Sequence, residues 1–102
     1  MSCCFYQLSN YDIYLALEQF CKSNIPYILT TSHITDEAHQ NENIKTGDWR
    51  LLNLTLSPFN FPKESIWECN DWIPSHPPAT LTMWSKEQIL SIMPELRHKL
   101  RK

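Results

Sequence analysis

Glycine is almost missing from this sequence, in which Gly47 is the single glycine among 102 residues. Phosphate-binding loops such as GxGxxG and GxxxxGK need several glycines, because the backbone must approach the ligand closely. Neither motif can be written anywhere in these residues. The Gly-x-Ser-x-Gly turn that carries the nucleophile of many hydrolases is excluded for the same reason.

The sequence also lacks a long apolar run and a strong net charge. No apolar stretch approaches the length that crosses a bilayer, so we predict no membrane association. The formal net charge of −2 gives no broad attraction for nucleic acid, and none is predicted as a partner. A basic helical tail is expected over residues 94–102, where cations complement the helix dipole. Its basic residues are Arg97, Lys99, Arg101 and Lys102.

Cysteine is present, but in no arrangement typical of a zinc site or a disulfide framework. Cys3 and Cys4 are adjacent, and Cys21 and Cys69 have no second cysteine two or three positions away. No secretory signal pattern is visible. We therefore expect reduced thiols in a cytoplasmic protein.

The overall composition is typical of a folded domain. The sequence is 42% hydrophobic, 12% aromatic and 20% charged, which is too apolar for a disordered segment. A chain of this length is expected to form one domain at most, over residues 1–102.

The first half of the sequence predicts a strand end, a helix, a strand and a loop. Residues 2–6 form a short apolar run that indicates the end of a buried strand. Ser9 is the expected N-cap of a helix over residues 10–22. Residues 25–31, rich in β-branched and aromatic side chains, predict a strand that is covered on both faces. The polar, acidic residues 32–48 predict a long surface loop, which should be the most mobile part of the fold.

The second half predicts an extended segment, two strands and a helix. Residues 49–62 should run extended and irregular, because their prolines disfavour helix in the residue before them. Two short β-prone runs, residues 66–69 and 80–84, can pair as antiparallel strands. Ser85 is the expected cap of a final helix, with Gln88 three positions later. Pro94 should interrupt that helix, although a proline can also start a new turn.

Two groups of residues are candidates for a functional site. The first contains His33, Asp36, Glu37 and His39, which could ligate a divalent metal. Their spacing matches no known ligand set, and the same residue types are common in solvated loops, so we predict no metal ligand. Combinations of cysteine, histidine and acid that could form a hydrolytic site lack a local signature and are discounted as well.

The second group lies between Gly47 and Pro62, where aromatic rings and polar side chains gather on irregular backbone. Such a mixture is typical of small-molecule pockets, although core packing explains each aromatic residue equally well. The residues concerned are Trp49, Arg50, Asn53, Phe59, Asn60 and Phe61.

This second group also carries a family resemblance. The sequence GDWRLLNL at residues 47–54, followed by PFNFP at 58–62 and LTMW at 81–84, resembles the C-terminal part of a group of bacterial class I S-adenosylmethionine-dependent methyltransferases. The resemblance covers nearly the whole chain and is specific in the middle segment. It implies that residues 3–8 contain the end of the fourth strand of that fold, that residues 25–31 are the fifth strand, and that the antiparallel pair forms the last two.

The resemblance therefore implies the C-terminal half of a Rossmann-like methyltransferase sheet, a truncated or split domain. Arg50, Asn53 and Phe59 are the expected substrate-binding residues. S-adenosylmethionine would bind only after completion by an N-terminal half, because the glycine-rich turn of the family is missing, and we expect no cofactor and no activity for this chain alone. The acidic-cysteine and histidine-leucine pairs of the family are replaced here by Cys3-Cys4 and Gln7-Leu8, which also argues against activity.

The expected partners are an N-terminal methyltransferase half or a second copy of the chain. The competing hypothesis is a non-catalytic module that binds another protein through an exposed sheet edge.

Overall fold

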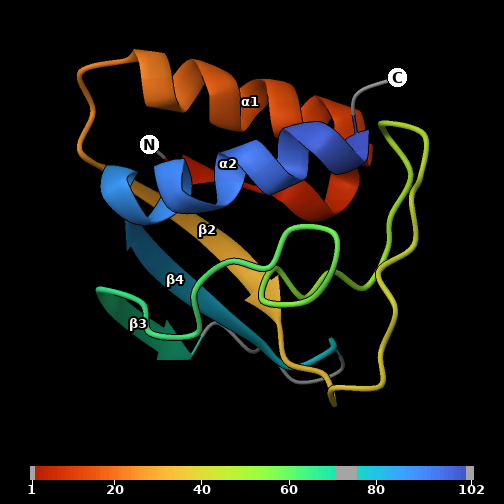
Figure 1. Cartoon of the computed structure of the whole chain (residues 1–102). Coiled ribbons are helices and arrows are strands. Elements are labelled where there is room, and N and C mark those ends of the chain that lie inside the picture. Colours follow the sequence, from red (N-terminus) through yellow and green to blue (C-terminus); the bar gives the residue numbers. More distant parts are fainter. Residues whose placement is uncertain (1, 71–75, 101–102) are drawn as a thin grey trace.

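The structure, a computed structural model, describes residues 2–70 and 76–100 of the chain. It contains a four-stranded sheet and two long helices that lie together on one side of the sheet (Figure 1). The helices are α1 (Asn10–Lys22) and α2 (Lys86–Leu100), and a short 3-10 helix, η1 (Phe5–Gln7), precedes α1. The expected α/β class is confirmed.

The strand order of the sheet is β1-β2-β4-β3. β1 (Ser2–Cys3) lies parallel to β2 (Tyr27–His33), while β4 (Ala79–Ser85) lies antiparallel to both β2 and β3 (Trp67–Asn70). The expected antiparallel pair is therefore confirmed as β3 and β4. The last strand in the chain is not at the edge of the sheet, however, because it lies between β2 and β3.

Helix α1 begins at the residue that the sequence predicted. Ser9 Oγ accepts a hydrogen bond from the backbone N–H of Asp12 at 3.1 Å. The return bond of a capping box runs through the loop instead, since Ser9 N–H donates to Thr46 Oγ1, which in turn donates to the Asp12 carboxylate. This start of α1 is thereby tied to residues more than thirty positions away.

Helix α2 begins with a complete capping box. Ser85 Oγ accepts from Gln88 N–H at 3.1 Å, and Gln88 Oε1 accepts from Ser85 N–H at 2.9 Å. The expectation that Pro94 interrupts the helix is wrong, because α2 continues to Leu100. Pro94 and Leu90, whose carbonyl loses its helical partner at position 94, are both exposed, so water can solvate that carbonyl. Residues 94–100 of the expected basic tail are the last turns of α2, and residues 101 and 102 lie outside the described residues.

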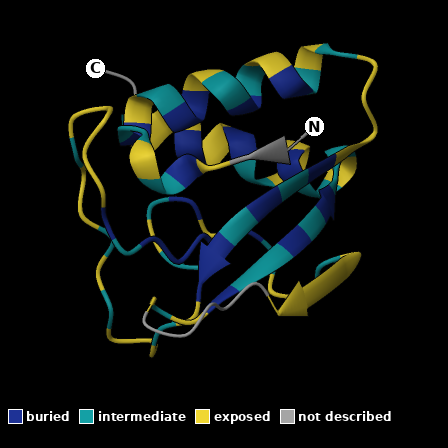
Figure 2. Ribbon diagram, turned by 180° about the vertical axis from the view of Figure 1, so that it is seen from behind, coloured by how far each residue is buried: buried dark blue, intermediate teal, exposed yellow. Residues whose placement is uncertain are grey.

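The two faces of the sheet are covered differently. Ile28 and Trp84 lie opposite each other on the face beneath the helices, and each is at most 1% exposed. Leu29 and Met83, one position further along each strand, point to the other side. Two half-exposed aromatic side chains share this second side, Tyr27 and Trp67. The expectation that β2 is covered on both faces is not met by the described residues, since both helices lie on one side (Figure 2).

The apolar core lies between the helices and the first face of the sheet. Residues 49–62 form the expected irregular segment, and four of their side chains enter this core: Leu52, Leu54, Phe59 and Phe61. The rings of Phe61 and Trp84 meet edge to face, with centroids 4.8 Å apart. The irregular segment therefore covers the part of this first face that the helices leave open.

The surface loop is shorter than expected, because Ser32 and His33 belong to β2. Most residues from 34 to 48 are exposed, but the loop is anchored at several points. Asn41 exchanges hydrogen bonds with the backbone of Asn53, and Gly47 N–H donates to Gln7 O at 2.9 Å. The high mobility of this loop stays a prediction, which amide hydrogen exchange can test.

Candidate functional site

A hollow of about 210 Å³ lies at the carboxyl ends of the two parallel strands. η1 follows β1 in the chain, and His33 is the last residue of β2, so both strands deliver side chains to the same edge of the sheet. Ligands of open α/β sheets bind in the crevice at this edge. The lining residues are Tyr6, Thr31, His33, Trp49, His76, Pro77 and Ala79.

Three aromatic rings from three separate segments meet in this hollow. The ring of His33 lies 5.3 Å from that of Tyr6 and 5.6 Å from that of Trp49, at interplanar angles of 65° and 64°. These are edge-to-face arrangements, which aromatic pairs prefer. We call Tyr6, His33 and Trp49 the aromatic trio. Trp49 is 50% exposed, so part of its ring is open to solvent.

His33 is held rigidly at the centre of the trio. Its backbone N–H donates to Leu52 O at 2.8 Å, and its Nδ1 accepts from Leu52 N–H at 2.9 Å. Desolvation lowers the pKa of this imidazole below its usual value; hydrogen bonding with the Leu52 backbone offsets part of this effect, and the proximity of His39 adds a smaller lowering. A neutral ring whose Nδ1 accepts a hydrogen bond carries its proton on Nε2.

Arg50, an expected substrate-binding residue, is buried beneath the start of α1. Its guanidinium donates to Leu8 O at 2.6 Å, to Asn10 Oδ1 and to Glu42 O. The residue is 3% exposed, and desolvation lowers the pKa of the guanidinium. These bonds connect η1, α1, the surface loop and the irregular segment, and they fix the backbone next to Trp49.

The other two expected substrate-binding residues occupy different places. Asn53 is 9% exposed, donates to Thr35 Oγ1 at 2.9 Å and accepts from the hydroxyl of Thr55 at 2.7 Å. It borders a second hollow, on the helix side of the sheet, together with Thr80. Phe59 is 1% exposed and belongs to the apolar core. The structure therefore does not bring Arg50, Asn53 and Phe59 to one cleft, and their contact with a substrate stays a prediction.

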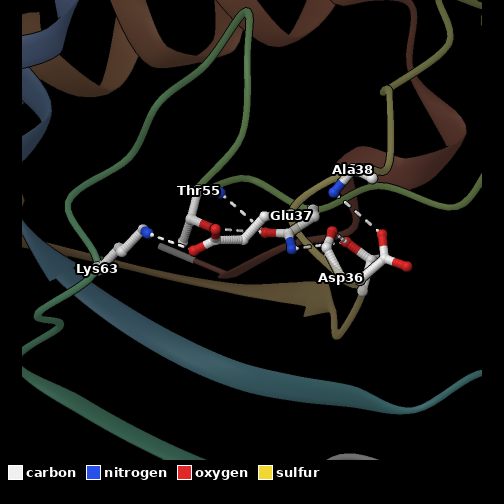
Figure 3. Close-up of polar contacts among 7 residues, drawn as sticks. Asp36, Glu37, Ala38, Thr55 and Lys63 are labelled. Atoms are coloured by element: carbon white, nitrogen blue, oxygen red, sulfur yellow. Dashed lines mark hydrogen bonds and ion pairs between the residues drawn. The ribbon is translucent and has the colours of Figure 1, made fainter.

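The acidic residues of the surface loop form local contacts. Asp36 Oδ1 accepts from the backbone N–H of Ala38 at 3.1 Å, and the Glu37 carboxylate accepts from Lys63 Nζ at 3.3 Å (Figure 3). His39 Nε2 lies 3.1 Å from Leu51 O. Among the described residues, no three histidine, cysteine, aspartate or glutamate side chains come together as they would around a metal ion.

Sequence reasoning named His33 and Trp49 for other roles and missed Tyr6. Tyr6 lies in η1, three positions after the end of a two-residue strand, which is too short to stand out as a pattern. The available signal was positional, because His33 ends β2 and Tyr6 lies in the turn after β1, the strand parallel to it. Recognising that signal required knowing that β1 and β2 are neighbours.

Comparisons with protein-family models, with curated proteins and with solved structures found no match for this chain. None of the described helices is both long and apolar enough to span a bilayer.

Proposed function

We propose that this chain is the C-terminal, substrate-side portion of an S-adenosylmethionine-dependent methyltransferase, inactive until an N-terminal half completes it. The observation that carries the proposal is the parallel pairing of β1 and β2, with α1 between them in the chain and the aromatic hollow at their carboxyl ends. This is how a doubly wound sheet positions a ligand site.

An N-terminal half would join the sheet by pairing with β1. In a doubly wound sheet the fourth strand lies between the first and the fifth. β1 corresponds to the fourth strand in the resemblance, and it pairs with β2 on one side only among the described residues. The first strand of an N-terminal half would pair with the side of β1 that faces away from β2. The glycine-rich turn after that strand would then lie near the carboxyl ends of β1 and β2, where the hollow is.

The residues of this chain do not fit the methyl donor by themselves. The 102 residues contain one glycine, Gly47, which lies in the surface loop and not after a strand. A cradle of backbone N–H groups for the donor is therefore not assigned to this chain. The chain would instead form the substrate side of the cleft, and the hollow at β1 and β2 would receive the methyl acceptor.

Complementation tests the proposal. The chain is co-expressed with the polypeptide encoded directly upstream, and S-adenosylmethionine is titrated by calorimetry into the chain alone and into the complex. We expect no heat from the chain alone and a Kd of about 1–100 μM, typical of enzyme substrates, for the complex. Micromolar binding by the isolated chain contradicts the proposal, as does an upstream polypeptide that forms no complex or confers no binding.

A non-catalytic interaction module is the second candidate, and β3 favours it. All four residues of this edge strand are exposed, and an exposed edge can recruit another chain by strand addition. The upstream reading frame distinguishes the two candidates. A strand followed by GxGxxG supports the split enzyme, while an unrelated upstream protein, together with loss of self-association on Glu68→Pro, supports the module.

A further inference from the structure

The hollow of the aromatic trio has the properties of a selective site. Tyr6 comes from η1, His33 from the end of β2 and Trp49 from the irregular segment, so the three rings converge from separate parts of the fold. A trio that only sealed the core would be buried throughout. Trp49 instead leaves half of its surface exposed above a hollow.

Among the described residues, the lining of the hollow contains no aspartate, glutamate, lysine or arginine. An anionic ligand group would find no permanently charged partner among these residues, and burying a charge without a partner is costly. His33 is neutral for the physical reasons given above, so it does not supply a positive charge near neutral pH. An uncharged ligand group fits this lining best.

The lining does provide polarity at a few points. His33 contributes an Nε2–H donor, and the side chains of Thr31 and Tyr6 add polar surface. Apolar surface from rings and from Pro77 and Ala79 makes up the rest. A volume of about 210 Å³ is below the range of pockets for drug-sized ligands, so it admits one small ring system and not a whole nucleoside.

The position of Trp49 is fixed by the hydrogen bonds of the residues next to it. Arg50 follows it directly and is bound to Leu8 O, Asn10 and Glu42 O, while His33 is bound to Leu52 through both its backbone N–H and its ring Nδ1. The open part of the Trp49 ring is therefore a preorganised stacking surface, and preorganisation reduces the entropy lost on binding.

We propose that the aromatic trio binds an uncharged, planar heteroaromatic ring, which stacks on Trp49 and accepts a hydrogen bond from His33 Nε2–H. The identification of this ring as part of the methyl acceptor rests on the proposed function. The ring binding itself rests on the hollow alone.

The test uses nicotinamide, an uncharged heteroaromatic ring, titrated into the full chain. The readout is the indole Nε1–H signal of Trp49 in ¹H–¹⁵N correlation spectra, assigned by its loss in Trp49→Phe. We expect this signal to shift with a Kd of about 1 mM, the affinity of a fragment of some ten heavy atoms. No shift up to ten times that concentration overturns the proposal.

Charged probes of similar size test the selectivity. Benzoate, an anion, should bind at least about tenfold more weakly than nicotinamide, because the hollow offers it no counter-charge. Tetramethylammonium should also bind more weakly. If it binds more tightly than nicotinamide, the trio is a cation cage and the proposal is wrong.

Two matched variants locate the binding. Trp49→Ala should weaken nicotinamide binding at least about tenfold, the loss expected for one stacked ring. Trp67→Ala removes an equally exposed indole from β3, away from the hollow, and should leave the Kd unchanged. Circular dichroism confirms that both variants are folded, and equal losses in both contradict the proposal.

The outcomes separate this inference from the proposed function. If the hollow binds no ring, the complex with the upstream polypeptide can still bind S-adenosylmethionine. If the complementation fails, the shift of the Trp49 signal by nicotinamide remains, and the hollow is then a ligand site in a protein of another class.

Discussion

Buried polar side chains connect distant segments of this protein. Arg50 holds η1, the start of α1 and the surface loop together with three hydrogen bonds, and its Nε has no partner among the described residues. His33 links β2 to the irregular segment through both its backbone and its ring. The guanidinium that was expected to contact a substrate thus already donates hydrogen bonds within the protein.

Replacing Arg50 by lysine should destabilise the protein by about 2–4 kcal/mol, because an ammonium cannot reproduce the planar fork that reaches three acceptors. Urea unfolding measures the change. Lys63→Gln breaks only the exposed pair with Glu37 and should stay within about 0.5 kcal/mol of the wild type. Similar losses in both variants would contradict the structural role of Arg50.

The stability of the protein should depend on pH through His33. Its pKa in the folded state is lowered, chiefly by desolvation, so the unfolded chain binds a proton more readily. The stabilisation is fully present above the unfolded pKa of about 6.5 and is lost as the pH falls below it. His33→Asn, whose Oδ1 can replace the Nδ1 acceptor, should flatten this dependence. His98→Asn, an exposed substitution in α2, should leave the pH dependence unchanged. Unfolding curves between about pH 5 and pH 8 compare the wild type with the two variants.

The helices of the fold are determined by local signals of unequal strength. α1 and α2 both begin at serine caps that are visible in the sequence, although Thr46 completes the first cap from the loop. Pro94 is a strong local signal for an interruption, yet α2 continues through it. The packing of Met93 and Leu96 in the core outweighs the lost hydrogen bond.

Pro94→Ala should therefore stabilise α2. The substitution restores the N–H that position 94 lacks and removes the clash of the ring with the preceding turn, which together cost about 3 kcal/mol in an ordinary helix interior. We expect a gain of about 1–2 kcal/mol and a Tm higher by about 4–15 °C. Thermal unfolding followed by circular dichroism measures it. Glu95→Ala, at the next exposed position, serves as the control, and an unchanged Tm in Pro94→Ala would show that the helix is already kinked to suit proline.

At the scale of the whole molecule, the described residues form no covering layer over one face of the sheet. Tyr27 and Trp67 are 46% and 48% exposed on this face, beside Leu29 and Met83. Sheets of α/β proteins usually have helices on both faces, so this asymmetry is what a half of such a sheet would show. A face of this kind favours association.

Sedimentation at several concentrations should accordingly show a dimer or larger species of the isolated chain. The double substitution Tyr27→Lys and Trp67→Lys should shift the equilibrium toward the monomer, because burying two ammonium groups at a contact is costly. Leu90→Lys, at a position equally exposed on α2, should have no such effect. A compact monomer at every concentration, which unfolds cooperatively, would show that the chain closes its own core.

The sequence by itself determined the local elements of this protein. Periodicity and capping residues placed α1 at Asn10–Lys22, and β-propensity placed β2 and the β3–β4 pair within two or three residues of their observed bounds. These signals depend on neighbours a few positions apart, and the chain contains them in full. The absence of glycine motifs was equally a property of the sequence alone.

Only the tertiary structure decided what lies next to what. The insertion of β4 between β2 and β3 depends on long-range pairing, which no local pattern encodes. The same is true of the aromatic trio, because Tyr6, His33 and Trp49 are far apart in the sequence and meet only when β1 and β2 end at one edge. The role of Arg50 also depends on the tertiary structure. Its residue type suggested a contact with a ligand. Folding instead brings Leu8, Asn10 and Glu42 next to it, and a buried guanidinium must form hydrogen bonds with such partners because an unpaired buried charge is costly.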